Sequence, residues 1–166
     1  MKTTSLSLKE HIYQLLETVP DPEVPVISVI DLGIVRDVIV TDNIIEIVIT
    51  PTYTGCPAMD MIETNIKAVL QDNGFNNVKI KSILSPAWTT DWLSESGKNK
   101  LRAYGIAPPV GRSTDKSVLT GEAKLVCCPQ CGSDNTEMIS QFGSTACKSL
   151  FKCLDCKEPF DYFKCH

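Results

Sequence analysis

The sequence predicts a small α/β (α+β) domain, in which helices pack on one face of a small mixed sheet, followed by a C-terminal zinc ribbon. Two observations predict this fold class. Between residues 7 and 104, apolar residues alternate between helical and strand spacing, in the order helix, strand, strand, helix, strand, helix. Between residues 125 and 166, two Cys-x-x-Cys pairs supply the four thiolates of a structural zinc site.

The first helix is expected to begin at Ser7, which can act as its N-cap, with Glu10 closing a capping box. Three prolines between residues 20 and 25 end this helix. One helical face carries the apolar side chains of Leu8, Ile12, Leu15, Leu16 and Val19.

A β-hairpin follows the first helix. The segments 34–40 and 44–50 are rich in isoleucine and valine, and residues 41–43 between them (Thr-Asp-Asn) are typical of a tight turn. A loop from Pro51 to Cys56 then leads into the second helix.

The second half of the domain repeats the alternation of helix and strand. A helix is predicted over residues 57–72, and Asn73-Gly74 ends it as a C-cap pair. A third strand is predicted over 78–84 and a short helix over 94–104.

The composition divides the chain into three parts. Residues 1–106 form the α/β domain, residues 107–124 form a linker that contains prolines, glycines and hydroxyl side chains, and residues 125–166 form the ribbon. The ribbon has few large apolar residues, so metal ligation, which contributes on the order of 10–16 kcal/mol, is expected to decide its folding.

The candidate metal ligands lie in two short turns that 21 residues separate, which is enough for a hairpin. Cys127 could compete with its neighbour for the first turn, but the pair followed by Gly132 fits a tight turn better. Cys127, Cys147 and Cys165 remain without an assigned role. Four thiolates favour zinc, although iron or a cluster uses the same ligands. The predicted ligands are Cys128, Cys131, Cys153 and Cys156.

Charge and hydropathy exclude several classes of protein. The net charge is −4, and neither residues 1–121 (11 basic, 14 acidic) nor residues 122–166 (5 basic, 6 acidic) are basic, which argues against a nucleic-acid partner. No apolar run is long enough to cross a bilayer. The N-terminus lacks the apolar block of a signal peptide, so the eight cysteines indicate a reduced, cytoplasmic, metal-binding protein.

Cys56 is the candidate reactive residue of the first domain. It precedes Pro57 at the expected start of a helix, where unpaired N–H groups favour a thiolate that can act as nucleophile or metal ligand. The alternative is a buried cysteine that packs as a small apolar side chain. Glu23 and Asp31 lie in turns, where carboxylates usually cap backbone N–H groups. No nucleophile–base pair or nucleotide motif is present, so an enzyme is not expected.

Aromatic residues at two places could form partner surfaces. Trp88 and Trp92 flank two threonines, and the segment 160–163 (Phe-Asp-Tyr-Phe) is too rich in aromatic residues for a small ribbon to bury fully. We therefore expect both patches to face a client subunit or a second copy of the chain. The alternatives are that the tail folds back onto the first domain, so that both patches form an internal contact, and that at least one tryptophan packs in the core.

Three motifs together resemble the iron–sulfur cluster assembly factor family. They are the turn 21–25 (Asp-Pro-Glu-Val-Pro), the strand entry 31–35 (Asp-Leu-Gly-Ile-Val) and the loop 50–57 (Thr-Pro-Thr-Tyr-Thr-Gly-Cys-Pro). The resemblance covers about residues 7–90, and it implies that the thiol of Cys56 is the one used by this family. In the function expected here, Glu23 and Asp31 would position the Cys56 loop or a partner.

The rest of the chain resembles the PaaD family of phenylacetate-degradation proteins. The segments that carry this resemblance are 88–92, 104–109, 142–148 and 158–166. It implies an accessory or maturation factor of the phenylacetyl-CoA epoxidase system in aerobic phenylacetate degradation. That system pairs a di-iron oxygenase with an iron–sulfur flavin reductase.

The function expected from these resemblances is assembly of an iron–sulfur or iron centre in a client subunit. Cys56 would hold iron or a cluster transiently, and the ribbon would hold structural Zn²⁺ and dock the client. The partners would be subunits of the epoxidase complex, with self-association as a further option. The alternative is a non-catalytic structural subunit of the complex, in which Cys56 is only packed.

Overall fold

The computed structural model describes residues 2–42, 44–110 and 125–164. The chain divides into two compact units, one of Met1–Trp88 and Trp92–Ser94 and the other of Thr89–Asp91 and Glu95–His166. Within the described ranges, no helix is long and apolar enough to cross a membrane.

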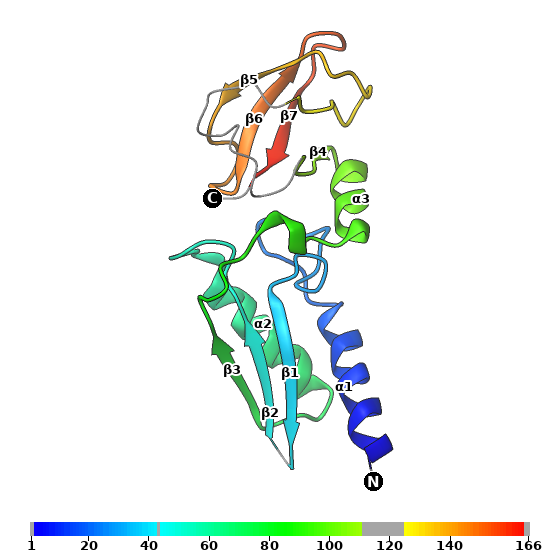
Figure 1. The fold of residues 1–166 in the computed structure, drawn as a ribbon, viewed down its shortest axis with the longest axis vertical. Helices are drawn as coiled ribbons and strands as arrows, with labels where there is room; N and C mark the ends of the chain where they lie inside the picture. The colour runs from blue at the N-terminus through cyan, green and yellow to red at the C-terminus, as the bar shows by residue number, and fades with distance from the viewer. Residues whose placement is uncertain (1, 43, 111–124, 165–166) are drawn as a thin grey trace. The chain divides into compact units, whose positions relative to one another are not determined.

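The first unit is a three-stranded mixed sheet with two helices on one face (Figure 1). Strand β1 (Val35–Thr41) pairs antiparallel with β2 (Ile44–Ile49), and β3 (Val78–Ser82) pairs parallel with β2. Helix α1 (Lys2–Leu16) contacts β1 and α2, and α2 (Ala58–Asp72) contacts β3. The predicted α/β fold class with helices on one face is confirmed.

The core of this unit follows the two periodicities seen in the sequence. The side chains of alternate residues in β2 point toward the helices. Helical side chains spaced three or four residues apart pack against them. The buried set includes Ile45, Ile47 and Ile49 of β2 with Ile12, Leu16, Ile62, Ile66 and Leu70 of the helices.

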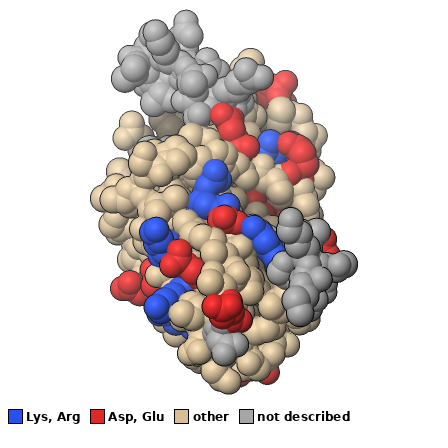
Figure 2. Space-filling model, turned by 60° about the horizontal axis from the view of Figure 1, so that its bottom comes forward, with Lys and Arg blue, Asp and Glu red and all other residues tan. Residues whose placement is uncertain are grey.

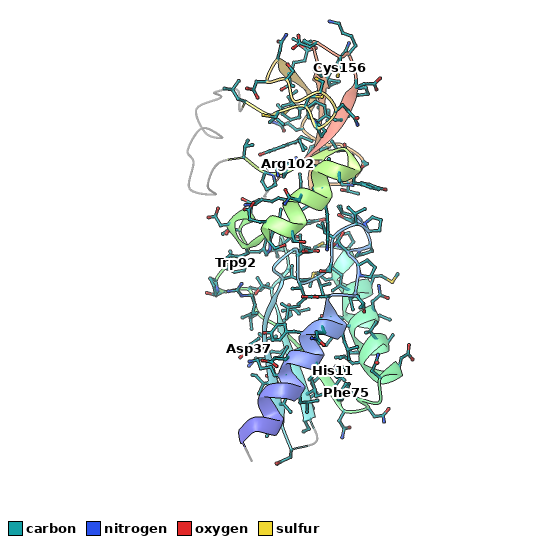
Figure 3. All side chains as sticks on the ribbon, turned by 90° about the vertical axis from the view of Figure 1, so that its right-hand side faces the viewer. His11, Asp37, Phe75, Trp92, Arg102 and Cys156 are labelled. Carbon is teal, nitrogen blue, oxygen red and sulfur yellow. The ribbon has the colours of Figure 1, made fainter. Side chains whose placement is uncertain are left out.

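Two polar or aromatic contacts fix α1 at its exposed side (Figure 3). Lys9 forms a salt bridge of 2.6 Å with Asp37 of β1. The ring of His11 lies 6.2 Å from that of Phe75, just beyond α2. His11 is exposed.

The start of α1 differs from the prediction. The helix begins at Lys2, so Ser7 lies inside it. An N-cap residue has non-helical backbone angles, so the predicted capping box of Ser7 and Glu10 is wrong. In the hairpin turn, Asp42 has a φ of 48°, while Asn43 lies outside the described residues.

The second unit contains a four-stranded sheet in the order β4-β7-β6-β5 (Figure 1). Strands β5 (Thr136–Ser140), β6 (Lys148–Cys153) and β7 (Pro159–Phe163) are antiparallel neighbours. The two-residue strand β4 (Ile106–Ala107) pairs parallel with β7.

The division of the chain differs from the predicted domain limits. Helix α3 (Glu95–Tyr104) and β4 belong to the second unit, although the sequence assigned residues up to 106 to the first domain. The reason is the pairing of β4 with β7, which the sequence does not show. The 3₁₀ turn Thr90–Trp92 precedes α3. Most of the predicted linker, residues 111–124, lies outside the described residues.

The aromatic residues of β7 are buried within the second unit. Phe160, Tyr162 and Phe163 are each at most 5% exposed. The rings of Phe160 and Tyr162 pack on Phe151 of β6, at centroid distances of 5.9 and 5.5 Å. The expectation that this segment forms an exposed partner surface is therefore wrong, because three adjacent strands give it a core.

The two tryptophans are held by the first unit rather than exposed as a patch. Trp88 is buried, and its Nε1 donates a hydrogen bond of 2.9 Å to the carbonyl oxygen of Leu32. Trp92 is half-buried, and the guanidinium of Arg36 lies 3.6 Å from its ring centroid. Internal packing, the alternative considered for these residues, is what the structure shows.

The turn at residues 31–33 binds the segment that contains these tryptophans. The backbone N–H and the hydroxyl of Ser94 donate to the carbonyl oxygen and the carboxylate of Asp31, both at 2.8 Å. Gly33 has a φ of +72°, and a Cβ at this position would lie 2.2 Å from the carbonyl oxygen of Trp92. We call this arrangement of residues 31–33 and 92–94 the strap clamp.

We expect Gly33→Ala to open the strap clamp and to lower the free energy of unfolding by at least about 2 kcal/mol. A left-handed backbone alone costs a non-glycine residue about 1–2 kcal/mol, and the clash with Trp92 adds to it. Tryptophan fluorescence measures the change directly, because the chain has two tryptophans and both lie in this segment.

Gly74→Ala is the matched control. Gly74 also has a positive φ, of +90°, but no atom lies within 4 Å of an added Cβ. It should cost about 1 kcal/mol and leave the native tryptophan spectrum unchanged. Equal effects of the two substitutions would contradict the role of Gly33 in the clamp.

Candidate metal centre and the Cys56 loop

Two tight turns bring four cysteines together in the second unit. The first turn runs from Cys128 to Cys131 before β5, and the second from Cys153 to Cys156 between β6 and β7. Backbone hydrogen bonds shape both turns: the N–H of Gly132 donates to Cys128, and the N–H of Cys153 donates to Glu158. We call these turns the first and second knuckle.

The four sulfur atoms are arranged as a metal would require. All four lie within 4.8 Å of one another. The sulfurs of Cys128 and Cys156 are 3.7 Å apart, and those of Cys131 and Cys153 are 3.6 Å apart. A tetrahedral zinc ion with Zn–S bonds of about 2.3 Å requires sulfurs about 3.8 Å apart, so distances and donor type both fit.

The residue directly after each knuckle has a left-handed backbone conformation. Gly132 follows the first knuckle with a φ of 76°, and Lys157 follows the second with a φ of 68°. The two turns therefore share one backbone geometry although only one has glycine. Lys157 lies in a conformation that costs a non-glycine residue about 1–2 kcal/mol, and its ammonium group donates to the carbonyl oxygen of Leu154.

The thiols strongly influence one another. The backbone N–H of Cys156 is the main cause that lowers the pKa of Cys153, to about 7. The backbone N–H of Glu158 lowers the pKa of Cys156, but desolvation and three neighbouring thiols outweigh it and raise the pKa to about 12. For Cys131, the N–H of Ser133 acts likewise, and desolvation and neighbouring thiols again raise the pKa. The thiols of Cys131 and Cys156 therefore resist ionisation, whereas that of Cys153 ionises more readily than an ordinary thiol.

The remaining cysteines lie outside this cluster. Cys127 is exposed, and its thiol donates a hydrogen bond of 2.6 Å to Asp134, which raises its pKa. Cys147 is buried, and its sulfur is 3.0 Å from the hydroxyl of Thr145. Cys165 lies outside the described residues. Cys127 therefore does not replace Cys128 in the first knuckle.

Cys56 lies at the end of the loop between β2 and α2. It is half-buried, and helix α2 begins at Ala58, two residues later. Its N–H donates to Tyr53 and its carbonyl accepts from Met59, so the loop closes directly onto the first turn of the helix. At the base of this loop, Thr50 is buried, and its hydroxyl has no hydrogen-bond partner among the described residues.

The two residues predicted to support Cys56 make contacts within their own turns. Asp31 accepts hydrogen bonds from the N–H and hydroxyl of Ser28 and from Ser94, which places it in the strap clamp. Glu23 is half-buried in the turn that the carboxylate of Asp21 organises, and its own N–H donates to that carboxylate at 2.9 Å. These contacts give Asp31 a structural role in its turn, and the supporting role of Glu23 and Asp31 toward Cys56 stays a prediction.

Sequence reasoning missed the polar residues around the knuckles. Asp155 lies between the two cysteines of the second knuckle and accepts hydrogen bonds from Ser133 and Asn135, just after the first knuckle. The sequence does show short polar side chains inside and directly after the Cys-x-x-Cys turns, and these could have predicted hydrogen bonds between the two turns.

The face shown in Figure 2 carries charges of both signs among its described residues. On this face, lysines and arginines alternate with aspartates and glutamates over the described residues. This agrees with the balanced charge of the sequence and gives no support for a nucleic-acid interface.

Comparison with known proteins identifies the family. A model of the iron–sulfur cluster assembly protein family matches residues 9–81, and a model of the PaaD zinc beta ribbon domain matches residues 112–164. A relative from Escherichia coli is provisionally named as one of the subunits of 1,2-phenylacetyl-CoA epoxidase. It is 47% identical over 154 residues, which cover 93% of this chain and 91% of the relative. The chain belongs to the PaaD family.

Outside the ribbon, this PaaD chain is similar to shorter proteins. An Fe–S protein maturation auxiliary factor from Porphyromonas gingivalis is 35% identical over 103 residues, covering 61% of this chain and 97% of the relative. The crystal structure of a domain of unknown function from Bacillus anthracis has a TM-score of 0.54 and 31% identity, and covers 57% of this chain and 92% of that one. The PaaD family thus adds a metal-binding ribbon to a domain that also occurs alone.

We expect zinc binding to the PaaD ribbon to weaken at least about 100-fold for each pH unit below 7. Cys131 and Cys156 have raised pKa values and are protonated at pH 7, so each zinc ion must displace at least two protons. Proton release on binding means that affinity rises with pH. Competition with a chromophoric chelator at pH 6, 6.5 and 7 measures this slope, and a slope of tenfold or less would contradict it.

Proposed function

We propose that this protein is a cytoplasmic, non-catalytic maturation factor of a phenylacetyl-CoA epoxidase system. In this proposal it assists assembly of an iron–sulfur or iron centre in a client subunit, either the oxygenase or the iron–sulfur flavin reductase. The transferred iron or cluster is cargo that Cys56 binds transiently.

The observation that carries this proposal is the position of Cys56. It is a half-buried thiol two residues before the start of α2, in the domain that the chain shares with proteins named Fe–S protein maturation auxiliary factors. A thiol beside the unpaired N–H groups of a helix start is suited to bind iron. It is also open enough to release cargo to another protein.

The ribbon has a separate task in this proposal. Cys128, Cys131, Cys153 and Cys156 hold one structural zinc ion, which supplies the cross-link that a small sheet needs to be stable. Four thiolates fill the tetrahedron, so this ion has no open position for chemistry. The stable ribbon then gives the client a surface to bind.

A second candidate is a structural subunit of the epoxidase without any transfer role. The naming of the Escherichia coli relative among the subunits of the epoxidase favours this candidate. In that case Cys56 is only a packing residue and the protein remains in the complex after the client is active. The two candidates differ in whether the thiol of Cys56 is needed.

We expect the purified protein to contain one zinc ion per chain and Cys153→Ser to lose it. Hydroxyl oxygen is a poor substitute for thiolate at a zinc site, and Cys153 is also fully buried in the ribbon core. Elemental analysis gives the metal content, and amide exchange reports which strands lose protection. Loss should be confined to the sheet of the second unit, β4–β7, and an unchanged zinc content would refute the ligand assignment.

We expect Cys56→Ala to reduce activation of the client epoxidase at least tenfold while leaving zinc content and complex assembly intact. The test is epoxidase activity and iron content of the client after co-expression with each variant. Cys127→Ala is the matched control, because it removes a thiol that lies outside the metal cluster. Full activation by Cys56→Ala would favour the structural-subunit candidate.

A further inference from the structure

Asp155 connects the two knuckles by a route that does not involve sulfur. Its carboxylate accepts a hydrogen bond from the hydroxyl of Ser133 and another, of 2.8 Å, from the side-chain amide of Asn135. Asp155 belongs to the second knuckle, whereas Ser133 and Asn135 follow the first. The side chain therefore spans the two halves of the metal centre.

Backbone hydrogen bonds carry this connection to the ligands themselves. The carbonyl oxygen of Ser133 accepts from the N–H of Cys128 at 2.9 Å, and that of Asn135 accepts from the N–H of Leu154 at 2.8 Å. The hydroxyl of Ser133 also accepts from the N–H of Asn135 at 3.0 Å. Moving Asp155 away would thus loosen the loop that positions Cys128 and the turn that positions Cys153.

Charge alone does not explain a carboxylate at this position. Zinc with four thiolates has a formal charge of −2, so a further negative charge nearby opposes metal binding. Asp155 is exposed, so water screens this repulsion but does not reverse its sign. On charge alone, a neutral side chain at this position would favour metal binding more than a carboxylate does. The contribution of the carboxylate is therefore its hydrogen bonds.

We propose that Asp155 is a positioning residue that latches the second knuckle to the first, so that the four sulfurs are held at ligand distances before the ion binds. The proposal rests on the zinc site proposed for the ribbon. Residues that orient metal ligands commonly change metal affinity 10- to 100-fold when removed. The latch acts on the ligands through Ser133 and Asn135 and does not touch the metal.

The test compares zinc and cobalt binding to the full chain and three variants. Asp155→Ala removes both hydrogen bonds and the charge, Asp155→Asn removes the charge but keeps one acceptor oxygen, and Glu158→Gln removes a nearby charge outside the latch. We expect the zinc Kd to rise 10- to 100-fold in Asp155→Ala and less in Asp155→Asn. Glu158→Gln should leave it unchanged or slightly lower.

Cobalt absorption distinguishes the latch from loss of the site. Each variant, once saturated, should show the thiolate charge-transfer bands of the parent, because all four ligands remain. Asn135→Ala should weaken binding too, and combining it with Asp155→Ala should add little, since both break one connection.

Three outcomes would overturn the proposal or its basis. An unchanged Kd in Asp155→Ala, or equal effects of Asp155→Ala and Glu158→Gln, would overturn the latch and leave the zinc site standing. Failure of the parent chain to bind zinc or cobalt through thiolates would instead overturn the proposed zinc site.

Discussion

The second unit depends on four sulfur atoms that must meet within a few ångströms. Cys128 and Cys153 belong at once to this thiol cluster and to the apolar core, where they pack with Phe151, Phe160 and Tyr162. Packing and metal geometry therefore cannot vary independently. A metal that holds the sulfurs also fixes the ends of the strands, so a sheet of short strands keeps its aromatic residues buried without a larger core.

The first unit depends on a different constraint, the close approach of its own chain at Gly33. The left-handed turn lets the carbonyl group of Trp92 lie where a side chain would otherwise be, and Asp31 then binds Ser94 twice. A motif that seemed suited to support Cys56 thus has an architectural use. Its carboxylate is bound within the fold.

The sequence was sufficient to predict those features that depend on residue patterns at short spacing. Cys-x-x-Cys pairs, isoleucine-rich strands and the helix before Asn73 need only local rules, and the structure places them as predicted. Local rules failed where distant segments decide. The parallel pairing of β4 with β7 moved the unit boundary, burial by neighbouring strands covered Phe160 and Tyr162, and Asp155 gained its partners from the other knuckle.

The two kinds of cysteine differ in how many ligands the chain itself supplies. Within the described residues, potential metal ligands form a cluster of three or more only at the ribbon. A metal ion bound there has a complete coordination shell of four thiolates, which favours stable binding over transfer. A cluster at Cys56 would have one thiolate from the described residues of the first unit, whereas clusters are held by about four. If its other ligands come from a client or a second copy of the chain, any cargo bound at Cys56 is shared with that partner from the start. Incomplete coordination is thus the physical condition for transfer, and it follows from the solitary, half-buried position of this thiol.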